Sequence, residues 1–468
     1  MLETIGALII EGANQIWGAP MLVLLLGGGL YFLIYSRLAP VRYIGHAISI
    51  LTGKFDKPEE KGELSHYQTL STALAGTVGM GNISGVAIAI TMGGPGAIFW
   101  MWISALVGVS TKYFECTLAV LFRGYDSAGE LQGGPMYYIR EGLGRRWMPM
   151  ALFFSIVGMV GVSPLFQANQ LTQIIRDAVL VPNKIDVSLT TDLLTGIVIA
   201  ALVALVVVGG IKRIGSVTGR LVPLMVVIYM LAVLGIVFSN TSEIIPSLRL
   251  IVYDAFTGNA VLGGAVGAVI VTGVRRAAFS NEAGLGTAPM AHGAAKTDEP
   301  IREGLVAMLG PIIDTIVICT LTALAIIITG VWQETGYDGI TITTHAFEST
   351  YPMIGKYLLT LCVTFFALST LFAFPYYGAK CLGFVAGVRY QHWYNYFFIA
   401  MIMVGAVSQL NVIVSLVDIA FALMAIPTII STILLSPHVR RESAIYFGRL
   451  KRGEFKQQSS RKPTSTVH

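Results

Sequence analysis

Long apolar segments recur along almost the whole chain, and no long polar block separates them. The hydrocarbon core of a bilayer is about 30 Å thick, so one helical span needs roughly 20 mostly apolar residues. Only 12% of the 468 residues are charged, whereas about 25% are charged in a typical soluble domain. The sequence therefore predicts an all-α integral membrane protein with many spans and short loops.

Hydropathy, bounded by glycine, proline and charged residues, predicts eleven transmembrane helices. They cover residues 18–36, 68–90, 95–122, 150–176, 189–210, 219–239, 257–288, 304–331, 355–378, 391–408 and 411–436. Alternate loops and the C-terminal tail carry most of the Lys and Arg residues, which the positive-inside rule assigns to the cytoplasm. We expect a multi-pass protein of the plasma (inner) membrane, with the N-terminus outside and the C-terminus in the cytoplasm.

Composition excludes several other classes. The net charge of +5 comes mainly from the tail after Ser436, and beside a membrane such a tail indicates contact with anionic lipid, not with nucleic acid. No P-loop, nucleophile motif or Cys/His cluster is present, so we expect neither an enzyme nor a cofactor. The four cysteines show no metal-ligand spacing, and we interpret them as core thiols: Cys116, Cys319, Cys362 and Cys381.

Two predicted spans are interrupted by glycine and polar residues. The second contains "AGTVGMGNISG" and the seventh contains "VTGVRRAAFSNEAGLGTAP". Non-helical backbone at membrane depth must be buried in protein or line a wet cavity. These spans begin two successive groups of five helices with opposite expected directions, which is typical of inverted-repeat transporters. The expected units are an N-terminal helix and loop (1–66), two repeats (67–240 and 241–436) and a basic cytoplasmic tail (437–468).

A broken helix offers free N–H groups at one end, suited to a carboxylate, and free C=O groups at the other, suited to a small cation. Thr77 and Asn82 add side-chain oxygens, which suit an alkali cation. Close helix packing is the alternative explanation, because Gly81 and Gly85 are four residues apart. The matching break in the seventh span favours a binding site.

Several motifs resemble a known family. "GTVGMGN" (Gly76–Asn82) is similar to the unwound first helix of neurotransmitter:sodium symporters, which have the LeuT-type fold. "GGPGAIFWMWISALVG" (Gly93–Gly108) resembles the signature of the alanine or glycine:cation symporters, also called sodium:alanine symporters. "GGPMYYI", "FQANQ" and "FSNEAGLGTAPMAH" extend the resemblance over nearly the whole chain.

The resemblance implies a LeuT-like core of two inverted five-helix repeats (spans 2–11) and one extra N-terminal helix. It implies a monomer that takes up alanine and/or glycine with Na⁺ by alternating access. The implied substrate contacts are the backbone of Thr77, Gly79 and Met80, then Thr272 and Gly273 at the second break, with Phe279, Ser280 and Asn281 beyond it. The implied sodium ligands are the carbonyls of Ala75 and Val78 and the hydroxyls of Ser369 and Thr370, with a second sodium near Thr77 and Asn82 as a further option.

Gln167 and Gln170 are three residues apart and share a helix face. An amide both donates and accepts hydrogen bonds, which suits the two charged ends of an amino acid. We favour Gln170 for the pocket, and a hydrogen bond between helices is the alternative.

Buried charges leave further alternatives open, because ionisable residues within spans are functional candidates. Proton coupling through Asp314 or Asp418 is the runner-up mechanism, although either carboxylate could instead be hydrogen-bonded to neighbouring helices. Lys112 and Glu115 are expected to pair with each other. Near the cytoplasmic end of span 7, a salt-bridged inner gate or positive-inside anchoring would account for Arg275, Arg276 and Glu282. A channel or a non-transporting sensor on the same fold is the alternative from another class.

Overall fold

The computed structural model describes residues 2–56, 59–208, 210–257, 266–334 and 339–455. Its regular structure is almost entirely helical, as predicted. In the described part the only sheet is a hairpin of β1 (Gly124–Tyr125) and β2 (Leu131–Gln132).

Eight helices in the described ranges are long and apolar enough to cross a membrane. They correspond to predicted spans 2, 3, 4, 5, 6, 8, 9 and 11. Their bounds are His66–Gly93, Gly96–Leu121, Arg145–Leu180, Leu189–Val207, Gly210–Ser239, Pro300–Ile328, Gly355–Ala386 and Leu410–Lys451. A pair bent by 52°, Thr4–Ile16 with Ala19–Tyr35, gives a ninth if it is counted as one span.

The predicted count of eleven is not confirmed. Span 10 is α22 (Trp393–Val407), which at 15 residues is shorter than the roughly 20 that a perpendicular span needs. Span 7 is divided into α15 (Val266–Asn281) and α16 (Thr287–His292). Residues 258–265, where we expected span 7 to begin, lie outside the described residues.

Several of the long spans are composite. The first contains α1 (Leu2–Ile16), α2 (Ala19–Leu22), the π-helical turn Val23–Gly27 and α3 (Gly28–Tyr35). Span 2 is α6 (His66–Thr77) and α7 (Met80–Gly93), and span 4 is a 3₁₀ turn (Arg145–Trp147), α10 (Met148–Gly161), α11 (Leu165–Ile175) and a π turn (Arg176–Leu180). Span 8 is α17 (Pro300–Ala307), α18 (Leu309–Pro311), a π turn (Ile312–Cys319) and α19 (Thr320–Ile328).

The remaining spans are single helices: α8 (Gly96–Leu121), α12 (Leu189–Val207), α13 (Gly210–Ser239), α21 (Gly355–Ala386) and α23 (Leu410–Lys451). Short helices connect them: α4 (Ala39–Arg42), α5 (Ile44–Leu51), α9 (Pro135–Tyr138), the π turn Ile139–Leu143, α14 (Ile244–Thr257), α20 (Gly339–Thr350) and the 3₁₀ turns Thr241–Glu243, Val331–Gln333 and Val388–Tyr390. We did not predict α14 and α20.

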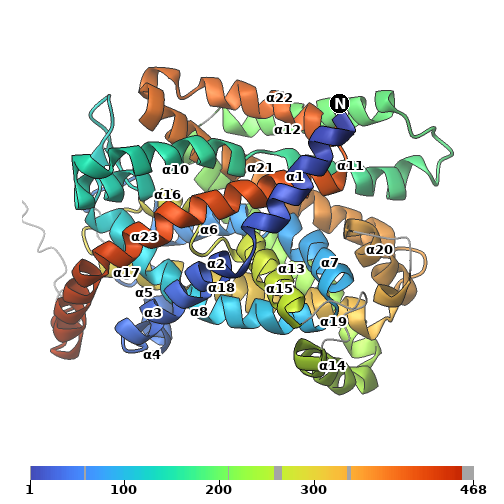
Figure 1. The fold of residues 1–468 in the computed structure, drawn as a ribbon, viewed down its shortest axis with the longest axis horizontal. Coiled ribbons are helices and arrows are strands. Elements are labelled where there is room, and N and C mark those ends of the chain that lie inside the picture. The colour runs from blue at the N-terminus through green and yellow to red at the C-terminus, as the bar shows by residue number, and fades with distance from the viewer. Residues whose placement is uncertain (1, 57–58, 209, 258–265, 335–338, 456–468) are drawn as a thin grey trace, which may run out of the picture.

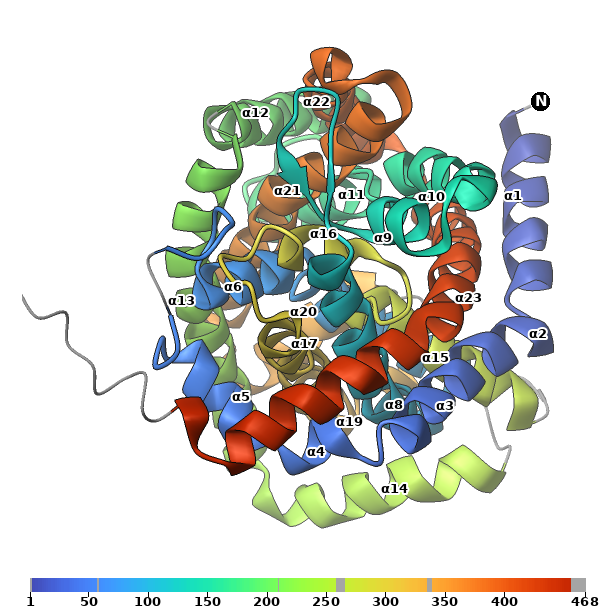
Figure 2. The same ribbon diagram turned by 90° about the vertical axis from the view of Figure 1, so that its left-hand side faces the viewer.

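The two broken helices occupy the interior of the molecule. The apolar window of α6 and α7 is 100% buried by other parts of the chain, and both helices lie among the others in Figure 1. In Figure 2, α1 and α14 lie at the edge. The indole N–H of Trp17 donates to the carbonyl oxygen of Asp418 at 2.9 Å and so fixes the N-terminal helices against α23.

Helix α23 is longer than predicted. We expected the last span to end at residue 436, but the helix continues to Lys451. Its extension is held by packing, because Phe447 stacks on Tyr43 with ring centroids 3.9 Å apart. The basic tail therefore begins as a helix, and residues 456–468 lie outside the described part.

Candidate functional site

The first break lies where the sequence predicts it, between α6 and α7. Val78 and Gly79 form the non-helical link. A Cβ atom on Gly79 would lie 2.3 Å from Oγ1 of Thr370, so this close approach requires glycine. The N–H of Gly79 donates to Oδ1 of Asn82 at 2.9 Å, and the orphan donors of the α7 N-terminus begin with Met80 and Gly81.

Oxygen atoms converge at the carbonyl end of this break. Oγ of Ser369 lies 3.4 Å from the carbonyl oxygen of Ala75 and 3.5 Å from that of Val78. Its single proton has a nearer acceptor, the carbonyl oxygen of Phe366 at 2.8 Å. The Ser369 hydroxyl therefore does not hydrogen-bond to both carbonyls, of Ala75 and of Val78. Three oxygens that face one another without such hydrogen bonds suit a cation between them.

The oxygen spacing also fits a small cation. Hard cations such as Ca²⁺ hold oxygens at about 2.3–2.6 Å, and Na⁺ has a similar ionic radius. Two ligands at about 2.4 Å and a right angle are about 3.4 Å apart, close to the spacing from Ser369 to Ala75 and Val78. The structure brings together three members of the predicted sodium set. The fourth, Thr370, points elsewhere, with its hydroxyl 3.4 Å from the carbonyl oxygen of Gly76 and beside Gly79.

The second break lies later than expected. Thr272 and Gly273 are inside α15, where Gly273 lets the helix approach the carbonyl oxygen of Ala97. The interruption runs from Glu282 to Gly286, and Glu282 has a left-handed φ of 53°. Such a backbone is uncommon for a residue other than glycine, and it is found most often at functional sites. Thr272 and Gly273 are packing residues, and placing the break at them was wrong.

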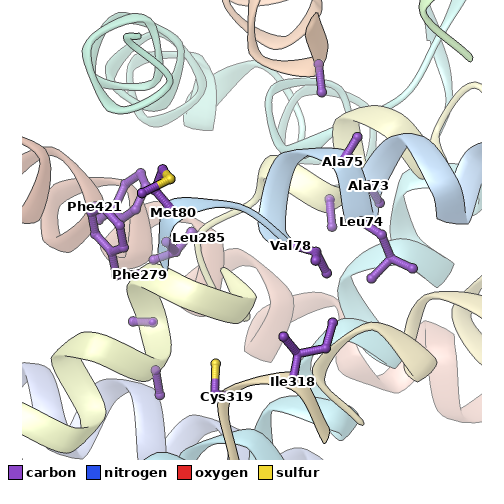
Figure 3. Packing of buried hydrophobic residues seen from close by; sticks show 14 of the residues in the cluster. Ala73, Leu74, Ala75, Val78, Met80, Phe279, Leu285, Ile318, Cys319 and Phe421 are labelled. Carbon is purple, nitrogen blue, oxygen red and sulfur yellow. The ribbon is translucent and has the colours of Figure 1, made fainter. Parts of the chain in front are cut away.

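A small cavity, with room for about one water molecule, lies between the two breaks. The expected residues Thr77, Gly79, Met80 and Phe279 line it, and Figure 3 shows Met80 beside Phe279 and Phe421. Six further residues line the cavity and were not predicted from the sequence: Gly161, Ser163, Phe166, Phe374, Val417 and Phe421. Thr370 and Glu282, for which we expected other roles, line it as well.

Gln167, not Gln170, faces this cavity. Its Oε1 is buried and has no hydrogen-bond partner among the described residues. Oε1 of Gln170 instead accepts the N–H of Ile340 at 3.1 Å, and its amide donates to Asn169 at 3.0 Å. Gln170 thus makes the hydrogen bond between helices that was the alternative for it, and favouring it for the pocket was wrong.

Ser280, Asn281 and Asn82 belong to a network outside the lining of this cavity. Asp314 is completely buried and accepts hydrogen bonds from Ser280 at 2.6 Å, Asn82 at 2.7 Å and Thr315 at 2.7 Å. Asn281 donates to Thr315 at 3.0 Å. All these donors are neutral. In addition, no Lys, Arg or His among the described residues lies within ion-pair distance of Asp314.

The oxygens expected to hold a second sodium are not brought together. The Thr77 hydroxyl donates to the carbonyl oxygen of Ala73 at 3.3 Å, whereas Oδ1 of Asn82 accepts the N–H of Gly79. The amide NH₂ of Asn82 is turned towards Asp314. A second sodium ion near Thr77 and Asn82 has no support from these contacts and stays a prediction.

The second intramembrane carboxylate forms an ion-pair cluster. Asp418 is completely buried, and its Oδ2 accepts from Arg275 at 2.7 Å and also from Arg276. The Arg276 guanidinium lies 5.3 Å from the ring of Phe279, which lines the cavity. Both arginines precede the break, on the half of span 7 opposite to His292. Their expected place near the cytoplasmic end of the span depends on the orientation in the membrane and stays a prediction.

Two further expectations concern buried side chains. Lys112 does not pair with Glu115, because its Nζ has no hydrogen-bond partner in the described part of the chain. All four cysteines are free and buried, as expected of core thiols. No group of His, Cys, Asp and Glu within the described ranges has metal-binding geometry.

The whole chain is similar in sequence to proteins of one known family. The model of a protein family described as "Sodium:alanine symporter family" matches residues 3–461. An uncharacterized transporter of Haemophilus influenzae is 40% identical, over 97% of this chain and 99% of its own length. The sodium/alanine symporter AgcS of Methanococcus maripaludis is 39% identical (94% and 97%), and the probable sodium/glutamine symporter GlnT of Bacillus subtilis is 34% identical (92% and 88%).

The fold has a solved relative of low sequence identity. The crystal structure of MhsT in complex with L-phenylalanine superimposes with a TM-score of 0.61, at 14% identity, over 80% of this chain and 90% of that chain. This likeness shows a LeuT-like fold. With its apolar helices and its family match over nearly the whole length, the chain is a multi-pass membrane transporter, not an enzyme, and it belongs to the sodium:alanine symporter family.

Proposed function

We propose that this protein takes up small neutral amino acids, alanine and/or glycine, together with Na⁺ across the plasma (inner) membrane. The observation that carries the proposal is the approach of Ser369 to the carbonyls of Ala75 and Val78. Val78 and Ser369 are neighbours in the chain of Gly79 and Thr370, which line the cavity. The ion would lie at the carbonyl end of α6. The amino-acid carboxylate would meet the N–H groups of Met80 and Gly81 at the start of α7.

The proposed substrate is small because aromatic rings bound the cavity. Phe166 and Phe279 have ring centroids 4.7 Å apart, and Phe279 and Phe421 are 5.6 Å apart. The unpartnered Oε1 of Gln167 could accept a hydrogen bond from the substrate ammonium group. The relative GlnT is named for sodium and glutamine, so substrate size is the property that the experiment must measure.

We further propose alternating access by a monomer with two inverted repeats, 67–240 and 241–436, a basic cytoplasmic tail and an outward N-terminus. In this orientation the ion pair of Asp418 with Arg275 and Arg276 lies on the outer side of the cavity, where it would close the outer entrance. Na⁺ would favour the outward-open form only as far as it binds that form more tightly than the inward-open one.

Proton coupling remains the second candidate. A relative from Bacillus subtilis is named a putative sodium/proton-dependent alanine carrier, and here Asp314 is buried with neutral partners alone among the described residues. Asp418 instead forms ion pairs with Arg275 and Arg276.

The test uses the purified protein in proteoliposomes. Uptake of labelled alanine is measured with a sodium gradient, with a pH gradient, and with neither, and unlabelled glycine, glutamine and leucine serve as competitors. We expect saturable uptake that sodium drives and glycine inhibits. Uptake driven equally well by a pH gradient without sodium would overturn the sodium assignment, and flux without saturation would favour a channel.

A further inference from the structure

A buried carboxylate bridges two histidines beside the broken helices. Oε1 of Glu303 lies 2.5 Å from Nδ1 of His292, and Oε2 contacts Nδ1 of His66. No more than 1% of any of the three side chains is exposed. His66 begins α6, His292 ends α16, and Glu303 lies in α17. This His–Glu–His cluster therefore joins both interrupted spans to a third helix.

One end of the cluster reaches the protein surface. Nε2 of His66 is buried without a hydrogen-bond partner among the described residues. It lies 4.0 Å from Oδ1 of Asp56, whose side chain is 45% exposed. A proton on Nε2 would therefore face an accessible carboxylate.

The other end approaches the candidate site. His292 lines a small cavity with Lys112, Asn281 and Thr77, and this cavity has room for about one water molecule. Thr77 also lines the cavity between the helix breaks. Nζ of Lys112 is buried and has no hydrogen-bond partner in the described part. The proposed sodium ligands take no part in this arrangement.

Other charged groups face this arrangement from the neighbouring elements. Those within electrostatic range of Lys112 are Glu115, Glu282 and Asp314, and those near the cluster are Asp56, Arg123 and Arg302. An imidazole can accept a proton at one nitrogen and release one from the other, and a carboxylate can do the same with its two oxygens. Each oxygen of Glu303 faces a different histidine, which is the geometry of a relay.

We propose that Lys112 and the His–Glu–His cluster form a proton-transfer route between the Thr77 cavity and the face that carries Asp56. A proton moves along it during each transport cycle, in addition to sodium and the amino acid. Only N–H and O–H bonds form and break, and the proton that enters at one end leaves at the other. The inference rests on the proposed function, and it assigns the proton to residues other than Asp314 and Asp418.

The test measures alanine and protons in the same proteoliposomes, which contain a pH-sensitive dye and have their membrane potential clamped with potassium and valinomycin. Addition of alanine under an inward sodium gradient should change the internal pH at a rate proportional to alanine uptake. Glu303→Gln and Lys112→Met should lower the proton flux per alanine at least about a hundredfold, the lower end of what one positioned proton-transfer group contributes.

His46→Gln is the matched control. His46 is a partly buried histidine that bonds to Tyr446 at 2.9 Å and lies outside the relay, so its substitution should leave the proton flux unchanged. Alanine uptake without a pH change would overturn the inference and leave the proposed function standing. Native proton flux in both Glu303→Gln and Lys112→Met would overturn it as well. Absence of alanine uptake would overturn the proposed function, and the inference with it.

Discussion

The hydroxyl oxygen of Ser369 lies 3.4 Å from the carbonyl oxygen of Ala75, a residue 294 positions earlier in the chain. The contact joins α21 to the broken first helix of the core. Such a contact depends on the break, because a regular helix would use the carbonyls of Ala75 and Val78 for its own hydrogen bonds.

Ser369→Ala removes the only side-chain oxygen of the three facing oxygens. A hydrogen bond or ligand contact to a charged group contributes about 1.5–3 kcal/mol, so we expect the sodium concentration for half-maximal alanine uptake to rise at least about tenfold. Uptake across a series of sodium concentrations measures this. Ser431→Ala is the control, because that hydroxyl donates to carbonyls of its own helix and is not one of the proposed sodium ligands. An unchanged sodium dependence in Ser369→Ala would contradict the sodium site.

Gln167→Leu and Gln170→Leu should behave differently although the residues are one helical turn apart. Gln167→Leu removes the unpartnered amide that faces the cavity, and alanine binding should weaken about tenfold at unchanged thermal stability. Gln170→Leu breaks the contact to Ile340 and should lower the melting temperature with little change in affinity. Calorimetry with alanine and thermal unfolding in detergent measure both effects, and the opposite pattern would return Gln170 to the pocket.

Gly79→Ala should abolish transport. Its Cβ atom would lie 2.3 Å from Oγ1 of Thr370, far inside van der Waals contact, so the link between α6 and α7 would have to move. In Gly85→Ala, in the following helix α7, the nearest atoms lie 3.9 Å from the new Cβ atom, and activity should be retained. Equal transport rates for both variants would mean that the geometry of the link does not matter for the site.

Asp418→Asn leaves Arg275 and Arg276 buried without their shared carboxylate. Loss of one partner of a buried ion pair costs about 3–5 kcal/mol, so we expect a large fall in melting temperature in detergent. Glu141→Gln, which breaks the more exposed pair with Arg140, should have an effect below about 1 kcal/mol. Similar melting temperatures for both variants would mean that the ion pairs of Asp418 do not stabilise the fold.

His46 predicts a pH dependence of stability outside the membrane spans. Burial, with added repulsion from Arg302 and Lys54, lowers the pKa of this imidazole to about 4. Between a pH of about 6.5 and about 4, the unfolded chain binds a proton at this residue and the folded protein does not. The contribution to stability is therefore complete above the unfolded pKa and is lost as the pH falls through this window. Unfolding of native protein and His46→Gln from pH 7 to 4 should show a shallower decline in the variant.

The sequence predicted the first break and misplaced the second for a physical reason. In a sequence, a glycine that interrupts a helix cannot be distinguished from one that lets the helix pack closely. Gly273, between Val271 and Val274, lets α15 pack closely against Ala97. The true break, "NEAGLG", has positive φ angles at Glu282, Gly284 and Gly286. Two glycines and one alanine among these six residues would have been the better signal.

The choice between the two glutamines could not be made from spacing. Residues three apart share a helix face, so only the position of α20, which supplies the N–H of Ile340, decides which amide is free. The pairing of His66 with Glu303 depends likewise on packing between segments 237 positions apart. Periodicity and motifs carry no information about contacts of that kind.

The Val78–Gly79 link places the proposed ligands of two different solutes on neighbouring peptide units. Val78 presents its carbonyl to the ion, and Met80, two positions on, presents its N–H to the carboxylate. Binding of either solute would fix the same few dihedral angles. The loss of conformational entropy would weaken the binding of the first solute only. The second solute would then bind to backbone that is already ordered. By thermodynamic reciprocity, alanine must then raise the affinity for sodium by the same factor by which sodium raises the affinity for alanine.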